Sequence, residues 1–254
     1  MNKPVTFSLK DKVSEEEWQL RRELAACYRL VAAHGWDDLI FTHISVRIPG
    51  DEHHFLINPF GMLFEEITAS SLVKIDLHGT PIEETPYMVN PAGFVIHGAI
   101  HEARDDAMCV LHTHTADGMA VSMQKDGLLP LTQTACSVHE DIAYHDYEGI
   151  VLDQDERERL IPNIGGCNNV ILRNHGLMTM GGTVGEAFLR MFFLQKACET
   201  QVKSLSMGQE IIPVPDDVSK KVYGQVNGSM NFAGMLNWQA MMRKVERDFP
   251  DFDQ

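Results

Sequence analysis

An apolar run that ends in two histidines constrains this chain more than any other segment. Residues 108–111 are apolar and uninterrupted, which predicts a short buried strand, and His112 and His114 follow with one threonine between them. Because residues two apart on a strand point to the same face, both imidazoles are expected to point the same way. This pattern places a pair of metal-ligand side chains at the end of a strand.

A third histidine stands at the end of another apolar run. His175 follows the predicted strand 170–173, and Gly176 after it permits a sharp turn. If two neighbouring strands end together, the three rings meet at one point. Three neutral imidazoles suit a divalent transition metal and leave coordination positions open for water or substrate. The alternative is a half-buried strand with a polar face, which His-x-His alone also fits.

Composition bounds the partners and the compartment. The chain has 254 residues, 44% of them hydrophobic, and a net charge of −15 from 21 basic and 36 acidic side chains. Nucleic acid or an anionic membrane needs a clustered positive field, so neither is an expected partner. The five cysteines form no Cys-x-x-Cys pair, which favours reduced thiols. Without a secretory signal or a membrane-spanning stretch, we expect a cytoplasmic protein.

The order of elements predicts one α/β domain with a mixed sheet and helical layers. Residues 1–13 are interpreted as a leader, 14–210 as the domain and 211–254 as a helical C-terminal extension. Capping patterns and helical spacing predict helices over 14–35, 91–102, 115–123, 153–161, 183–207 and 235–249, with a weaker helix in the tail between 213 and 235. Strands are expected over 39–48, 54–57, 71–77, 108–114, 128–134, 137–144 and 170–173.

Several segments in order carry a family likeness. These are Pro59–Gly61, Thr68–Ile75, Ala92–Phe94, Tyr144–Tyr147 and Leu172–Leu177. Over roughly residues 15–210 the chain resembles the class II aldolase/adducin family, and most closely the adducin head domain, which has no established catalysis.

The resemblance implies a fold, a metal and an assembly. It implies a class II aldolase-like three-layer α/β fold, with a central mixed, largely antiparallel sheet of the nine-stranded type flanked by helices. It implies a divalent metal, zinc first, with iron, manganese or cobalt as alternatives, at the positions of His112, His114 and His175. It also implies a small-molecule substrate and a homo-oligomer, commonly a tetramer with sites between subunits.

The departures from the family pattern bear on the substrate. The catalytic glutamate of the aldolases falls on Gly93, which can neither bind a metal nor carry a proton. At the phosphate-binding positions, His43 replaces an asparagine, Phe60 stands before Gly61, and Ala92 replaces a serine. The donors for a phosphate dianion are largely gone. With Phe60 and Phe94 nearby, an aromatic or keto-acid substrate fits better than a sugar phosphate.

Other polar residues are candidates for catalysis or substrate binding. His97 holds a position where the family also has histidine and is a candidate proton carrier, as are Tyr144 and His145. For each, the alternative is a histidine or tyrosine satisfied within the core. Arg173 could pair with a substrate carboxylate, or with one of the many acidic side chains. With His43, Phe60, Gly61, Ala92 and Gly93, it completes the expected substrate-binding set.

Two functions of different classes remain open from the sequence. One is a metal-dependent lyase-like enzyme that acts on a small oxo-acid or other carbonyl compound, with an iron-dependent oxygenase of aromatic keto acids as a variant. The other is an adducin-like binding or scaffold module without catalysis. A proton carrier near Gly93 that replaces the lost glutamate would favour the enzyme.

Overall fold

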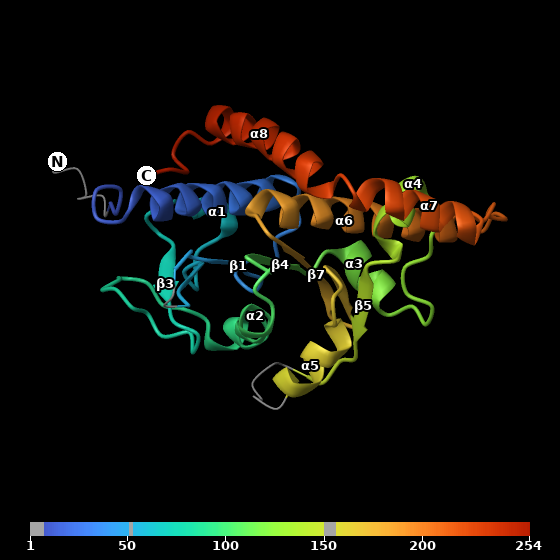
Figure 1. Ribbon diagram of the computed structural model, residues 1–254, viewed down its shortest axis with the longest axis horizontal. Helices are drawn as coiled ribbons and strands as arrows, with labels where there is room; N and C mark the ends of the chain where they lie inside the picture. The colour runs from blue at the N-terminus through green and yellow to red at the C-terminus, as the bar shows by residue number, and fades with distance from the viewer. Residues whose placement is uncertain (1–7, 51–52, 150–155) are drawn as a thin grey trace.

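The fold is built around one mixed sheet (Figure 1). The computed structural model describes residues 8–50, 53–149 and 156–254. Within them, seven strands lie in the order β3-β2-β1-β4-β7-β6-β5, and every pair is antiparallel except β5 with β6. This confirms the largely antiparallel mixed sheet, with seven described strands rather than nine. The strands are β1 (Ile44–Arg47), β2 (Phe55–Ile57), β3 (Val73–Ile75), β4 (Cys109–Thr113), β5 (Ile142–His145), β6 (Asn169–Leu172) and β7 (Gly176–Gly181).

Helices cover both faces of the sheet. The described helices are α1 (Glu15–Ala33), α2 (Pro91–Ala103), α3 (Ala116–Ser122), α4 (Gln133–His139), α5 (Glu156–Ile164), α6 (Val184–Ser206), α7 (Asp216–Asn227) and α8 (Met230–Asp248), with a 3-10 turn, η1 (Phe64–Glu66). Figure 1 shows α1 and α6 along one face with α8 outside them, and α2 and α5 on the opposite side. No helix in this part of the chain is long and apolar enough to cross a membrane.

The central strand β4 separates two hydrophobic cores. Cys109 and Leu111 pack in the core beneath α1 and α6, whereas Val110 packs in the core beneath α2 and α5. Because side chains alternate along a strand, His112 lies on the same face as Val110. The first candidate metal ligand, His112, therefore lies on the α2 side of the sheet.

Local sequence signals set the ends of the principal helices. The Ser14 hydroxyl accepts from the Glu17 amide at the start of α1, and Thr183 does the same for Glu186 at the start of α6. Thr115 caps α3 directly after His114 by accepting from the Gly118 amide. The predicted helices over 14–35, 115–123 and 183–207 match these elements within a few residues.

One predicted strand is absent, two are shortened and one strand was missed. The prediction of a strand over 128–134 is wrong, because Thr132 caps the helix α4, which also replaces the first part of the predicted strand 137–144 and leaves only β5. The expected strand 39–48 is reduced to β1, because Leu39 has a φ of 51° that interrupts extended structure. β7 was missed because its sequence has a single β-branched residue, Thr179, although all six of its residues are buried.

The C-terminal segment packs on the domain. α8 lies against α1 and α6, and α7 lies against α4. Phe252 is 2% exposed within the main core. The backbone carbonyls of Phe252 and Gln254 accept from the amides of Ala69 and Ser70 at 2.8 and 2.9 Å. The division at residue 210 stays a prediction. Of the expected leader, residues 1–7 lie outside the described part, and Leu9 packs against Trp18.

Candidate metal centre

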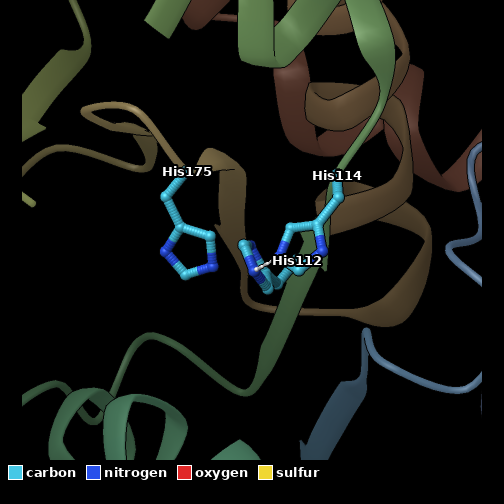
Figure 2. A group of neighbouring side chains, drawn as sticks. All are labelled: His112, His114 and His175. Atoms are coloured by element: carbon cyan, nitrogen blue, oxygen red, sulfur yellow. Dashed lines mark hydrogen bonds between the residues drawn. The ribbon is translucent and has the colours of Figure 1, made fainter. Parts of the chain in front are cut away.

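Three histidines from separate segments converge at one end of β4. His112 is the fourth residue of that strand, His114 comes just after its end, and His175 lies in the turn between β6 and β7. One nitrogen of each ring lies within 4.8 Å of those of the other two. Figure 2 shows the three side chains grouped at this point. Three imidazole nitrogens this close together match the protein ligands of a three-histidine metal site.

The convergence depends on a strand that the sequence analysis missed. β6 is not the neighbour of β4, because β7 lies between them. β7 runs antiparallel to β4, with Leu177 opposite Thr113, so the end of β4 lies beside the β6–β7 turn. Asn174 adopts a φ of 57° in that turn. A Cβ at Gly176 would collide with the Thr113 carbonyl oxygen, so only glycine allows this approach.

Hydrogen bonds fix which nitrogen of two ligands carries its proton. His112 Nδ1 lies 2.9 Å from the Leu177 carbonyl oxygen, and His114 Nδ1 lies 2.9 Å from a carboxylate oxygen of Asp38. Both partners accept, so both Nδ1 atoms donate, and in the singly protonated form of each ring the Nε2 atom carries a lone pair. The two Nε2 atoms are 2.8 Å apart. Two lone pairs at this distance repel each other unless a cation lies between them.

Burial keeps the rings of His112 and His175 uncharged. Burial, together with His114, His175 and His43, holds the pKa of His112 well below its ordinary value. Burial and His114 lower the pKa of His175 to about 4. Both rings are therefore neutral at pH 7, as metal ligands must be. The donor set fits a divalent transition metal.

A pocket opens onto the three rings. It has a volume of about 490 Å³, and His43 and His97 line it beside the ligands. Much of its wall is apolar, formed by Phe41, Ile96, Met119, Leu172 and Met178. Among the described residues that line it, none is a lysine or an arginine. This wall suits a small, partly apolar molecule better than a phosphate ester.

Two expected site residues interact elsewhere. The Arg173 guanidinium lies over the Tyr144 ring, 4.3 Å from its centroid, and donates to the Gln124 carbonyl oxygen at 2.6 Å. The Tyr144 hydroxyl accepts from the Leu128 amide at 3.0 Å. Neither residue is among the described lining of the pocket. In this structure the pair joins the loop before α4 to the sheet, and Arg173 also lines a small neighbouring pocket that contains His175.

The expected apolar substrate contacts are also displaced. Phe60 donates its amide to the Met88 carbonyl oxygen, and Gly61 follows in a turn with a φ of 98°. Phe94 is buried against Phe55, with ring centroids 5.4 Å apart. None of these is among the described residues that line the pocket, where other apolar side chains take their place.

The remaining residues of the predicted site lie in different parts of the structure. His145 is buried, and its Nδ1 lies 3.0 Å from the side-chain Nδ2 of Asn163. Ala92 and Gly93 lie in the first turn of α2, and their side-chain surroundings fall outside the described residues. The structure therefore brings His43 and His97, from the predicted set, to the pocket with the three candidate ligands.

Asp38 is the part of the centre that sequence reasoning missed. It lies in the loop after α1, 76 residues before His114 in the chain. With 36 acidic residues in the chain, no local signal marks this one. A carboxylate that receives the second ring nitrogen of a histidine ligand orients the ring and raises its basicity.

We therefore expect Asp38→Asn to weaken zinc affinity by roughly 10- to 100-fold while the fold is retained. The matched control is Asp37→Asn, which removes the same charge one residue away and should leave affinity near wild type. Competition with a zinc chelator of known affinity measures both. Equal affinities in the two variants would contradict the role given to Asp38.

Comparison with known proteins identifies the family of this chain. Residues 22–202 match the family model described as "Class II Aldolase and Adducin N-terminal domain". The chain belongs to the class II aldolase and adducin family. It is 55% identical over 248 residues to a putative aldolase class 2 protein of Caulobacter vibrioides, covering 97% of this chain and 96% of the relative. It is 49% identical over 190 residues to rat alpha-adducin, covering 74% of this chain but 26% of adducin.

Solved structures of the family share the fold. An aldolase II superfamily protein from Pseudomonas syringae superposes with a TM-score of 0.93 at 47% identity, over 97% of this chain and 99% of that one. L-fuculose 1-phosphate aldolase from Glaciozyma antarctica superposes with a TM-score of 0.83 at 29% identity, over 99% of this chain and 97% of that one. The three-layer class II aldolase fold is thereby confirmed.

Proposed function

We propose that this protein is a zinc-dependent, lyase-like enzyme that acts on a small oxo-acid or a related carbonyl compound. The observation that carries the proposal is the pair of Nε2 lone pairs of His112 and His114, 2.8 Å apart, with His175 beside them in a pocket. Three imidazole nitrogens that meet beside a pocket match the protein ligands of a three-histidine catalytic metal site.

The chain's own groups divide the work in this proposal. A divalent ion on three imidazoles polarises a carbonyl oxygen and stabilises negative charge that develops on it. Asp38 and the Leu177 carbonyl hold the rings of His114 and His112 in the tautomer that leaves Nε2 to the metal. Phe41, Ile96 and Met119 give the pocket an apolar wall against which the substrate can pack.

The substrate class follows from what the pocket lacks. Charged donors give the strongest hydrogen bonds to a phosphate, and the described lining contains neither lysine nor arginine, although Asn90, Tyr147 and Asn174 offer uncharged donors. His43 also stands where the family's phosphate site has an asparagine. We therefore propose an oxo-acid or an aldehyde rather than a sugar phosphate as substrate, with the carbonyl at the metal.

The test is turnover of a substrate panel by the zinc-loaded protein. We expect cleavage or decarboxylation of at least one small 2-oxo acid, no turnover of sugar 1-phosphates, and loss of activity in His114→Ala. His78→Ala, which removes an exposed histidine, serves as the control and should remain active. The absence of both binding and turnover across the panel would overturn the proposed reaction.

A second candidate is supported by the similarity to adducin. Rat alpha-adducin shares 49% identity with this chain over 190 residues, so a binding or scaffold role without catalysis is the alternative. A protein that holds no metal after reconstitution with zinc would favour this alternative. Zinc-dependent turnover would exclude it as the sole function.

We also propose a homo-oligomer, a tetramer by family resemblance, and a cytoplasmic location. All five cysteines are free thiols, which supports a reducing compartment. Light scattering of the purified protein tests the assembly, and a monomer at micromolar concentration would contradict it.

A further inference from the structure

A buried chain of hydrogen bonds lies behind the pocket wall. Ser45 of β1 places its Oγ 2.7 Å from His97 Nδ1 and 2.7 Å from His101 Nε2, both on α2. His101 Nδ1 in turn lies 2.9 Å from the Ala107 carbonyl oxygen. The three side chains are at most 1% exposed. None of these contacts involves a candidate metal ligand.

With neutral rings, this series of hydrogen bonds allows one self-consistent arrangement of protons. The Ala107 carbonyl oxygen can only accept, so His101 carries its proton on Nδ1 and presents a bare Nε2 to Ser45. Ser45 has a single proton, which it donates to His101 Nε2. Its oxygen must then accept from His97, so the proton of His97 is on Nδ1. The neutral His97 ring is left with a bare Nε2.

Both rings are neutral, as this arrangement requires. Burial lowers the pKa of His101 to about 3, against the Ala107 hydrogen bond, which raises it. Burial, His43, His101 and His112 hold the pKa of His97 well below its ordinary value. The alternative, a doubly protonated His97, would place a positive charge close to the candidate metal ion.

His97 Nε2 is an acceptor without a partner. The atom is buried and finds no hydrogen bond among the described residues, although the ring lines the pocket that contains the three candidate ligands. Buried polar atoms are normally paired, so an orphaned one calls for a group that the protein does not supply. The neighbouring pocket side chain is His43, whose ring centroid lies 4.3 Å away.

We propose that Ser45 and His101 lock His97 with its proton on Nδ1, so that Nε2 accepts a hydrogen bond from a hydroxyl of the bound ligand. This inference rests on the proposed function and narrows its substrate class. The preferred ligand is an oxo-acid or carbonyl compound with a hydroxyl group near the oxygen that meets the metal. Ser45 and His101 are positioning residues, and His97 is the residue that touches the hydroxyl.

The tautomer can be measured without any ligand. In the zinc-loaded full chain with ¹⁵N-labelled histidine, two-dimensional NMR distinguishes a protonated from a bare ring nitrogen, and His97→Asn identifies the His97 signals. We expect Nδ1 protonated and Nε2 bare in the wild type. Ser45→Ala should give a mixture of tautomers, whereas the control Ser137→Ala, at a buried serine whose hydroxyl bonds the Gln133 carbonyl, should not. A wild-type His97 with its proton on Nε2 would overturn the inference.

Ligand selectivity gives a second, independent readout. Calorimetry compares 4-hydroxy-2-oxobutyrate with 2-oxobutyrate, which differ by one hydroxyl. We expect the zinc-loaded wild type to prefer the hydroxylated ligand by roughly ten-fold. In Ser45→Ala the ratio of the two dissociation constants should fall to about one, while the zinc content stays unchanged. Equal binding of the two ligands by the wild type would refute the hydroxyl contact. Failure to bind zinc would instead refute the proposed function.

Discussion

Acidification from pH 6.5 to pH 4 is expected to destabilise the metal-free protein strongly. His97 and His101 are fully buried, with folded-state pKa values that lie well below 6.5 and at about 3. In this window the unfolded chain binds protons that the folded chain excludes, so stability falls as the pH falls. Each such histidine costs up to about 1.4 kcal/mol per pH unit. Summed over the two histidines and the whole pH window, this loss of stability is comparable with the roughly 5–15 kcal/mol that stabilises a typical domain.

Urea unfolding at pH 7, 5.5 and 4.5 in the presence of a chelator measures this dependence. His101→Gln removes one titrating ring while keeping hydrogen-bonding groups. It should lower the slope of the unfolding free energy against pH by the equivalent of about one proton. His78→Gln changes an exposed histidine and should leave the slope as in the wild type. A free energy of unfolding that is flat between pH 6.5 and 4.5 would contradict the buried neutral histidine network.

Removal of one side chain near the C-terminus is the second large effect that we expect. Phe252 is 2% exposed in the main core, and the backbone around it bonds Ala69 and Ser70. Phe252→Ala should lower the free energy of unfolding by about 3–5 kcal/mol, because it removes apolar burial and leaves a cavity. Urea denaturation of the zinc-loaded protein measures the loss.

The control for this change is another phenylalanine of the same segment. Phe232 on α8 is 62% exposed, so Phe232→Ala should change stability by less than about 0.5 kcal/mol. If the two variants unfold at the same urea concentration, the last residues do not stabilise the domain. A separate, loosely attached C-terminal extension would then be the better description.

Much of the fold could be predicted because its signals are local. Ser14 and Thr183 mark helix starts through side-chain caps, and the apolar run before His112 marks the central strand. The missed elements have weak local signals. α4 carries residues that also suit a strand, and β7 is defined by its pairing with β4 and β6 rather than by its own sequence.

The site, too, combines residues that local sequence patterns mark with residues that they do not. The shared direction of His112 and His114 follows from strand periodicity, and the turn at Gly176 marks His175. The role of Asp38 depends on a contact across 76 residues, which no local pattern reveals. Arg173 was expected to face the substrate, but its position over the Tyr144 ring is set by the packing of β5 against the loop before α4. Contacts between distant segments thus decide which polar residues reach the pocket.

The central claim is that His112, His114 and His175 hold a divalent metal, and elemental mass spectrometry of the purified protein tests it most directly. We predict close to one equivalent of zinc per chain in the wild type and in His78→Ala, and almost none in His114→Ala. Stoichiometric iron would favour the oxygenase variant of the enzyme. The absence of metal from the wild type after reconstitution, or equal metal in wild type and His114→Ala, would contradict the account.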